Sequence, residues 1–63
     1  MYKARFIEQI EHGGSDVSVV FGVFNTETGE LESKWQSSRM APANWNIAEK
    51  LASDRAAELN HAN

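Results

Sequence analysis

The run of residues from Val17 to Phe24 constrains the fold most strongly, because almost every position in it is β-branched, aromatic or small. In an extended strand, alternate side chains point to opposite faces. One face then carries Val17, Val19, Phe21 and Val23, and the other carries Ser18, Val20, Gly22 and Phe24. A strand that is apolar on both faces is typical of the centre of a sheet. We therefore predict a central strand over residues 17–25.

Glycine-containing segments on both sides of this run predict two hairpins, because glycine adopts the positive φ angles of tight turns. On the N-terminal side, Gly13-Gly14 is expected to form a two-residue turn that joins a first strand over residues 2–11 to the central strand. The expected pairs are Ala4 with Val23, Phe6 with Phe21, Glu8 with Val19 and Ile10 with Val17.

The second hairpin leads to a third strand, expected over residues 30–38, and its loop can have three or four residues. We favour the three-residue loop, with Gly29 in the left-handed conformation of a bulge. That choice places Leu31 and Trp35 on the same face as Phe21. A four-residue loop would move both side chains to the opposite face. The favoured pairs are Phe21 with Trp35 and Val23 with Ser33.

From Pro42 onward the apolar residues recur with the period of a helix. Proline suits the first turn of a helix, and residues 46–49 resemble a capping box, so the start is expected between residues 42 and 47. We predict a helix over about 43–60, with residues 61–63 loose. Its apolar half carries Trp45, Ile47, Ala48, Leu51, Ala52, Ala56 and Leu59. The three alanines at 48, 52 and 56 form a seam of small side chains that lets the helix lie close to a sheet.

These elements predict an α+β fold, in which a three-stranded antiparallel meander is covered on one face by the C-terminal helix. The helix is expected on the face that carries Phe21. The predicted core consists of Phe6, Val19, Phe21, Trp35, Trp45, Leu51 and Leu59. Trp45 has an alternative role as an exposed anchor. With 63 residues, the chain is expected to be one domain over 1–63, a marginal monomer and a complete gene product.

Composition narrows the function classes. The chain has no cysteine, which excludes a disulfide or a thiolate metal site, and its net charge of −3 argues against bulk attraction to nucleic acid or anionic membrane. No apolar run approaches the roughly 20 residues of a membrane span, and no signal peptide is evident, so we expect a cytoplasmic protein. Because neither a metal-ligand spacing nor a nucleophile–base pattern occurs, we predict no metal, no cofactor and no enzymatic activity.

The sheet face without the helix is expected to hold the binding residues. Apolar side chains lie there among cations, and Gly22 is expected to leave a flat spot between them. The candidates are Lys3, Arg5, Ile7, Val20, Phe24 and Lys34. An apolar patch with charged neighbours is typical of a partner site. We predict a non-enzymatic binding or regulatory protein that uses this face for self-association or for a protein partner. The same residues are also compatible with an ordinary solvated sheet face that carries a few scattered apolar side chains.

The alternative is a nucleic-acid-binding module that places Lys3, Arg5 and Lys34 on phosphates. In element order the chain resembles plant AP2-type DNA-binding domains and the arm-binding domains of tyrosine recombinases, which use the exposed sheet face in the major groove. Here acidic residues border that face, and the diagnostic motifs of those families are not present. The resemblance is one of topology, which by itself does not establish function.

Two opposite charges are predicted to face each other between sheet and helix. Glu8 occupies an inward position of the first strand, and Arg55 lies near the middle of the apolar half of the helix. Opposite charges that point into one interface usually pair, and the long arginine stem covers apolar surface. We therefore expect a structural Glu8–Arg55 ion pair.

Overall fold

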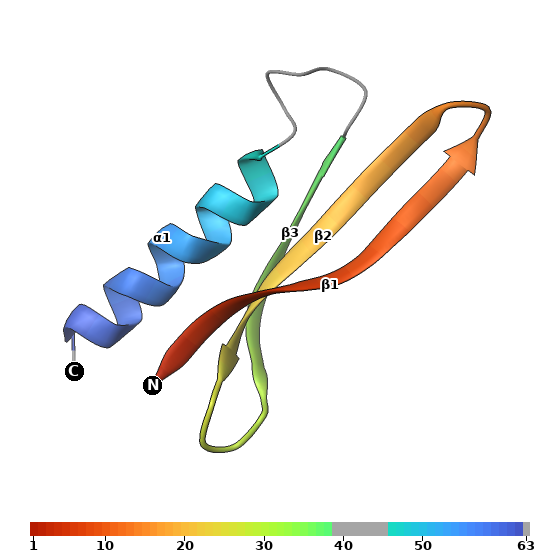
Figure 1. Cartoon of the computed structure of the whole chain (residues 1–63). Coiled ribbons are helices and arrows are strands. Elements are labelled where there is room, and N and C mark those ends of the chain that lie inside the picture. Colours follow the sequence, from red (N-terminus) through yellow and green to blue (C-terminus); the bar gives the residue numbers. More distant parts are fainter. Residues whose placement is uncertain (39–45, 63) are drawn as a thin grey trace.

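The computed structural model describes residues 1–38 and 46–62. The elements are β1 (Tyr2–Gly13), β2 (Asp16–Asn25), β3 (Leu31–Ser38) and α1 (Ile47–Ala62). The strands form one antiparallel sheet in the order β1-β2-β3, and α1 packs against one face of it (Figure 1). The predicted α+β meander with a C-terminal helix is thus confirmed, and the predicted strand limits agree with the observed ones within two residues.

The helix covers the predicted face of the sheet. Val23 of β2 is fully buried against Ala52 and Ala56 of α1, at the centre of the core. The third alanine of the seam, Ala48, is also fully buried. Half-buried side chains surround this centre, namely Tyr2, Ala4, Phe21, Trp35 and Leu59. Short side chains on the helix therefore set a close approach between the two layers.

Two residues of the predicted core, Phe6 and Leu51, are exposed, at 55% and 43% accessible. Ile47, which was predicted on the apolar half of the helix, is 42% accessible. Consecutive helical residues are turned by about 100°, so Leu51 points along the flank of the helix when Ala52 faces the sheet. Phe6 contacts the ring of Phe21 edge-on, with centroids 5.7 Å apart, at the margin of the core. The predictions for Trp45 and for a helix start at residues 43–45 lie outside the described residues.

The sheet helps to define the first turn of the helix. The backbone N–H of Lys50 donates to the carbonyl oxygen of Asn46 at 2.8 Å, which closes that turn. The N–H of Ala48 donates to the hydroxyl oxygen of Ser37 on β3 at 3.2 Å. A helix leaves its first four N–H groups without intrahelical acceptors, so this buried serine satisfies one of them. The cap therefore comes from a residue that is distant in sequence.

We expect Ser37→Ala to lower the free energy of unfolding by about 1–2 kcal/mol, because the buried N–H of Ala48 would lose its acceptor. Chemical denaturation followed by circular dichroism measures this change. Ser53→Ala, on the exposed side of the same helix, serves as the control and should be neutral or slightly stabilising. Equal stabilities for the two variants would show that the Ser37 contact contributes nothing.

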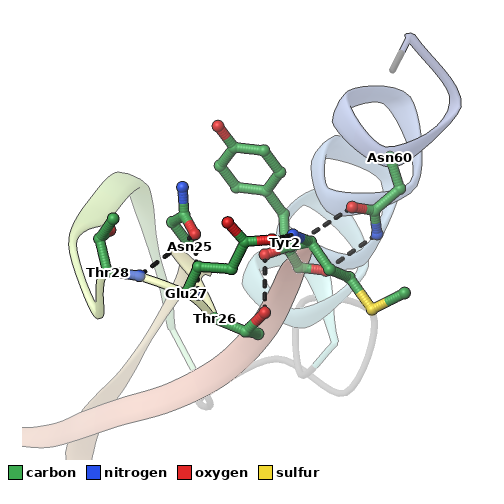
Figure 2. Close-up of polar contacts among 7 residues, drawn as sticks. Tyr2, Asn25, Thr26, Glu27, Thr28 and Asn60 are labelled. Carbon is green, nitrogen blue, oxygen red and sulfur yellow. Dashed lines mark hydrogen bonds and ion pairs between the residues drawn. The ribbon is translucent and has the colours of Figure 1, made fainter.

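The C-terminal end of α1 is held on β1, and the helix continues to Ala62 rather than fraying near Asn60 as predicted. The side-chain amide of Asn60 donates to the carbonyl oxygen of Tyr2 at 2.9 Å, and its oxygen accepts the N–H of Tyr2 at 2.7 Å (Figure 2). Beside this contact, the carbonyl oxygen of Met1 accepts the N–H of Thr26 at 2.8 Å. Residues 1 and 2 are therefore hydrogen-bonded to both the helix and the second hairpin.

The first hairpin contains a bulge that changes its register. Ala4 pairs with Val23 and Phe6 pairs with Phe21, as predicted. At Ile7 the register shifts by one residue, so that Glu8 pairs with Val20 and Ile10 pairs with Ser18. A shift of one residue turns the following side chains to the opposite face. The predicted pairs of Glu8 with Val19 and of Ile10 with Val17 are therefore wrong.

The turn of this hairpin also differs from the prediction. Gly13 pairs with Asp16, so Gly14-Ser15 forms the two-residue connection instead of Gly13-Gly14. Gly13 and Gly14 nevertheless both have positive φ angles, of 104° and 58° respectively. A second register shift, between Glu11 and Gly13, accompanies this placement of the turn.

The second hairpin combines features of both loops that the sequence allowed. The N–H of Asn25 donates to the oxygen of Glu30 at 2.9 Å, and the N–H of Gly29 donates to the oxygen of Asn25 at 2.7 Å. These bonds enclose a four-residue loop over residues 26–29, so the preferred three-residue loop is wrong, although Gly29 has the predicted positive φ of 78°.

A bulge at Glu32 then places Leu31 and Trp35 on opposite faces of the sheet. Phe21 pairs with Trp35 and Val23 with Ser33, as predicted, but the register shifts before Phe24 pairs with Leu31. Trp35 therefore stays on the helix side, where it packs beside the core. Leu31, which was predicted on that side, lies on the opposite face with Phe24.

Candidate functional site: the helix-free sheet face

The face of the sheet that α1 does not cover is the helix-free face. Strand alternation and the observed register place all six candidate residues on it. The bulges add Glu8, Ile10 and Leu31, and the regular alternation of β2 adds Asp16 and Ser18. Sequence reasoning missed Glu8, Ile10 and Leu31 because a bulge changes the facing of a residue without changing the residue itself.

The predicted flat spot at Gly22 is filled by two side chains. A β-carbon built at Gly22 would lie 2.6 Å from Cδ1 of Ile7 and 2.8 Å from Cδ1 of Leu31. It would also lie 3.1 Å from the backbone oxygen of Ser33. Glycine at this position thus lets side chains from both edge strands meet across the central strand. The expectation of an open flat spot is therefore wrong.

These contacts produce an apolar stripe along the helix-free face. It consists of Ile7, Ile10, Val20, Phe24 and Leu31. Val20 is almost fully buried within the stripe, whereas Leu31 is 45% accessible. The sheet therefore has apolar residues on both faces, but the helix covers only one of them.

Charged residues of opposite sign occupy different parts of this face. Arg5 and Lys34 both pair with Gly22 and flank it on the two sides, and Lys3 lies beside Phe24. Glu8 pairs with Val20, and Asp16 lies further along β2 near the first turn. One end of the face is therefore basic and the other acidic. Within residues 1–38 and 46–62, no ion pair engages Lys3, Arg5 or Lys34.

The predicted Glu8–Arg55 ion pair is wrong, because the bulge at Ile7 places Glu8 on the helix-free face. Arg55 instead pairs with Glu32, the bulged residue of β3, with Nη2 and Oε1 2.8 Å apart. It also contacts Glu58 one turn along the helix, at 3.5 Å. Hydrogen bonds from Arg55, and then from the Ser33 hydroxyl, lower the pKa of Glu32. The same contact with Glu32 raises the pKa of Arg55.

One contact on the helix-free face joins residues across the first hairpin. Nε2 of His12 and Oγ of Ser18 are 3.0 Å apart. Ser18 is only 6% accessible, so this hydroxyl is not presented to a substrate in the described structure. Within the part of the chain that the structure describes, no group of three potential ligand side chains is arranged to hold a metal ion.

The described helix is too short and too polar to span a lipid bilayer. The helix-free face is the candidate for an interaction, because it combines an apolar stripe with charges of both signs. Comparisons of the chain with protein-family models, with curated proteins and with solved structures find no match.

Proposed function

We propose that this protein is a non-enzymatic, regulatory binding protein that associates with a second copy of itself through the helix-free face. The observation that carries the proposal is the apolar stripe of Ile7, Ile10, Val20, Phe24 and Leu31, with cations beside its half near Phe24 and carboxylates toward the first turn. Apolar patches with a polar rim are characteristic of protein interaction sites.

A second copy is favoured by the small size of the core. Among residues 1–38 and 46–62, the fully buried apolar side chains are Val23, Ala48 and Ala52, which remove little apolar area from water. The chain has 63 residues and no cysteine, so no disulfide supplements this core. Small domains in this situation commonly gain stability by oligomerisation. Covering the apolar stripe with the same surface of another copy would add to the buried area.

The charge pattern favours a protein partner over a nucleic acid. Lys3, Arg5 and Lys34 could contact phosphates, but Glu8 and Asp16 lie on the same face and would repel them. A protein surface that carries both signs can complement this pattern. A second copy of the chain has such a surface.

The dimensions of the sheet predict a weak dimer. Three strands about 4.8 Å apart, with about nine residues at about 3.4 Å each, span a face of roughly 15 by 30 Å. This is small compared with the roughly 800 Å² that each partner buries in a standard interface. We therefore expect a dissociation constant in the micromolar range, and measurements must extend to high micromolar concentrations.

Sedimentation equilibrium of the wild-type chain and of Leu31→Arg tests the proposal. We expect the wild-type mass to rise from monomer to dimer with concentration, and the variant to remain monomeric, because a buried unpaired charge opposes the contact. Leu51→Arg is the matched control, because Leu51 is equally exposed but lies on the helix. This control should associate like the wild type.

Circular dichroism of the three proteins shows whether the variants are folded. A wild-type chain that stays monomeric throughout the range would overturn the proposal, and so would dimers of equal strength in Leu31→Arg. Binding of DNA or RNA by a monomeric wild type at about 50 mM salt, where electrostatic affinity is high, would assign the face to a nucleic acid instead.

A further inference from the structure

The arrangement of charges on the helix-free face selects one orientation of the two copies, an inference that rests on the proposed function. We infer that the copies stack with their strands antiparallel, so that the basic end of one face lies on the acidic end of the other. The basic end carries Lys3, Arg5 and Lys34, and the acidic end carries Glu8 and Asp16.

Two copies can stack face to face around a two-fold axis in two simple ways. Symmetric dimers use the same surface patch on both copies, so each contact occurs twice. When the axis runs along the strands, the strands are parallel and β1 lies over β3 of the second copy. When the axis runs across the strands, they are antiparallel and β1 lies over β1. Two sheets that pack face to face keep their strand directions aligned to within about 30°, and both the parallel and the antiparallel arrangement satisfy this condition.

The parallel arrangement brings like charges together. Arg5 and Lys34 are both register partners of Gly22 and therefore lie at the same level of the sheet, on its two edge strands. With β1 over β3, Arg5 of each copy would lie over Lys34 of the other. Two such contacts between cations would oppose association.

The antiparallel arrangement brings opposite charges together. Along β1, Arg5 is followed by the bulge at Ile7 and then by Glu8 on the same face. With β1 reversed over β1 and the axis at the level of Ile7, Arg5 of each copy lies over Glu8 of the other, and the apolar side chain of Ile7 lies between the two contacts. The bulge is essential, because without it Glu8 would face the helix.

Charge reversal distinguishes the two orientations by the sign of its effect. In the antiparallel dimer, Arg5→Glu and Glu8→Arg each create two contacts between like charges, and we expect each to weaken association by roughly tenfold. In the parallel dimer, Arg5→Glu would instead create two attractive contacts with Lys34 and strengthen association. Both positions are exposed, so neither substitution disturbs the core.

Mixing the two variants provides the decisive measurement. In a heterodimer of Arg5→Glu with Glu8→Arg, both charge contacts of the antiparallel arrangement are again between opposite charges. We therefore expect the equimolar mixture to associate about as strongly as the wild type, although each variant alone associates weakly. The difference in association between the mixture and each variant alone should shrink at high ionic strength, because the charges are partly exposed to solvent. Lys50→Glu on the helix controls for net charge.

Sedimentation equilibrium of the mixture and of each variant measures how strongly each associates. Stronger association of Arg5→Glu alone, or a mixture no stronger than its components, would overturn the antiparallel orientation. In either case, loss of association in Leu31→Arg would still support the proposed use of the face. A monomeric wild type would overturn both proposals together.

Discussion

Ala52→Leu is expected to destabilise the protein by about 2–3 kcal/mol, the cost of inserting extra atoms into a closely packed contact. Ala52 is completely buried on the helix and packs against Val23, so a larger side chain must push α1 away from the sheet. Small domains have total stabilities of roughly 0.05–0.15 kcal/mol per residue, so this loss is a large fraction of the whole. Thermal and urea denaturation, followed by circular dichroism, measure it.

Ala57→Leu is the matched control, because Ala57 lies on the exposed side of the same helix. Leucine and alanine both favour helices, so this variant should unfold at about the wild-type temperature. If both leucine variants unfolded together, the close approach of the helix along Ala48, Ala52 and Ala56 would be contradicted.

Gly22→Val is expected to destabilise the protein by about 2 kcal/mol, although valine normally favours strands. Its β-carbon would lie within 3 Å of the terminal carbons of Ile7 and Leu31. Those two side chains can swing aside, but the backbone oxygen of Ser33 at 3.1 Å cannot do so without moving β3. Alanine at this position should cost less, because it adds only the β-carbon. Urea denaturation measures both variants.

Lys34→Val is the matched control. It places valine on β3 directly beside Gly22, at an exposed position of the same face, and should leave the free energy of unfolding unchanged or raise it. The Gly22→Val penalty should also decrease in an Ile7→Val background, because that change removes Cδ1 of Ile7. A penalty that is identical in both backgrounds would mean that Ile7 does not lie over Gly22.

Residue patterns alone predicted the order of the elements and the covered face of the sheet. The apolar run at 17–25 identified the central strand, because apolar side chains on both faces are typical of a strand at the centre of a sheet. The alanines at 48, 52 and 56 marked the helical side that contacts the sheet, since their spacing matches a helical turn and their size allows close packing. The positive φ of Gly29 followed from its place in a short loop.

The composition of the helix-free face was predicted only in part. Its six candidate residues were placed on the correct face, but Glu8, Ile10 and Leu31 were expected on the helix side. The same error produced the wrong partner for Arg55, which pairs with the bulged Glu32. One extra residue in each edge strand accounts for all of these differences.

Alternation of apolar and polar residues is a local property, so residue patterns were enough to predict where the strands and the helix run and which face of the sheet the helix covers. The bulges at Ile7 and Glu32 depend on contacts between distant segments, such as Ile7 and Leu31 over Gly22 and Arg55 beside Glu32. The helix cap at Ser37 has the same origin. These features could not be read from local patterns, because the register of a strand is set by the packing it achieves across the whole sheet.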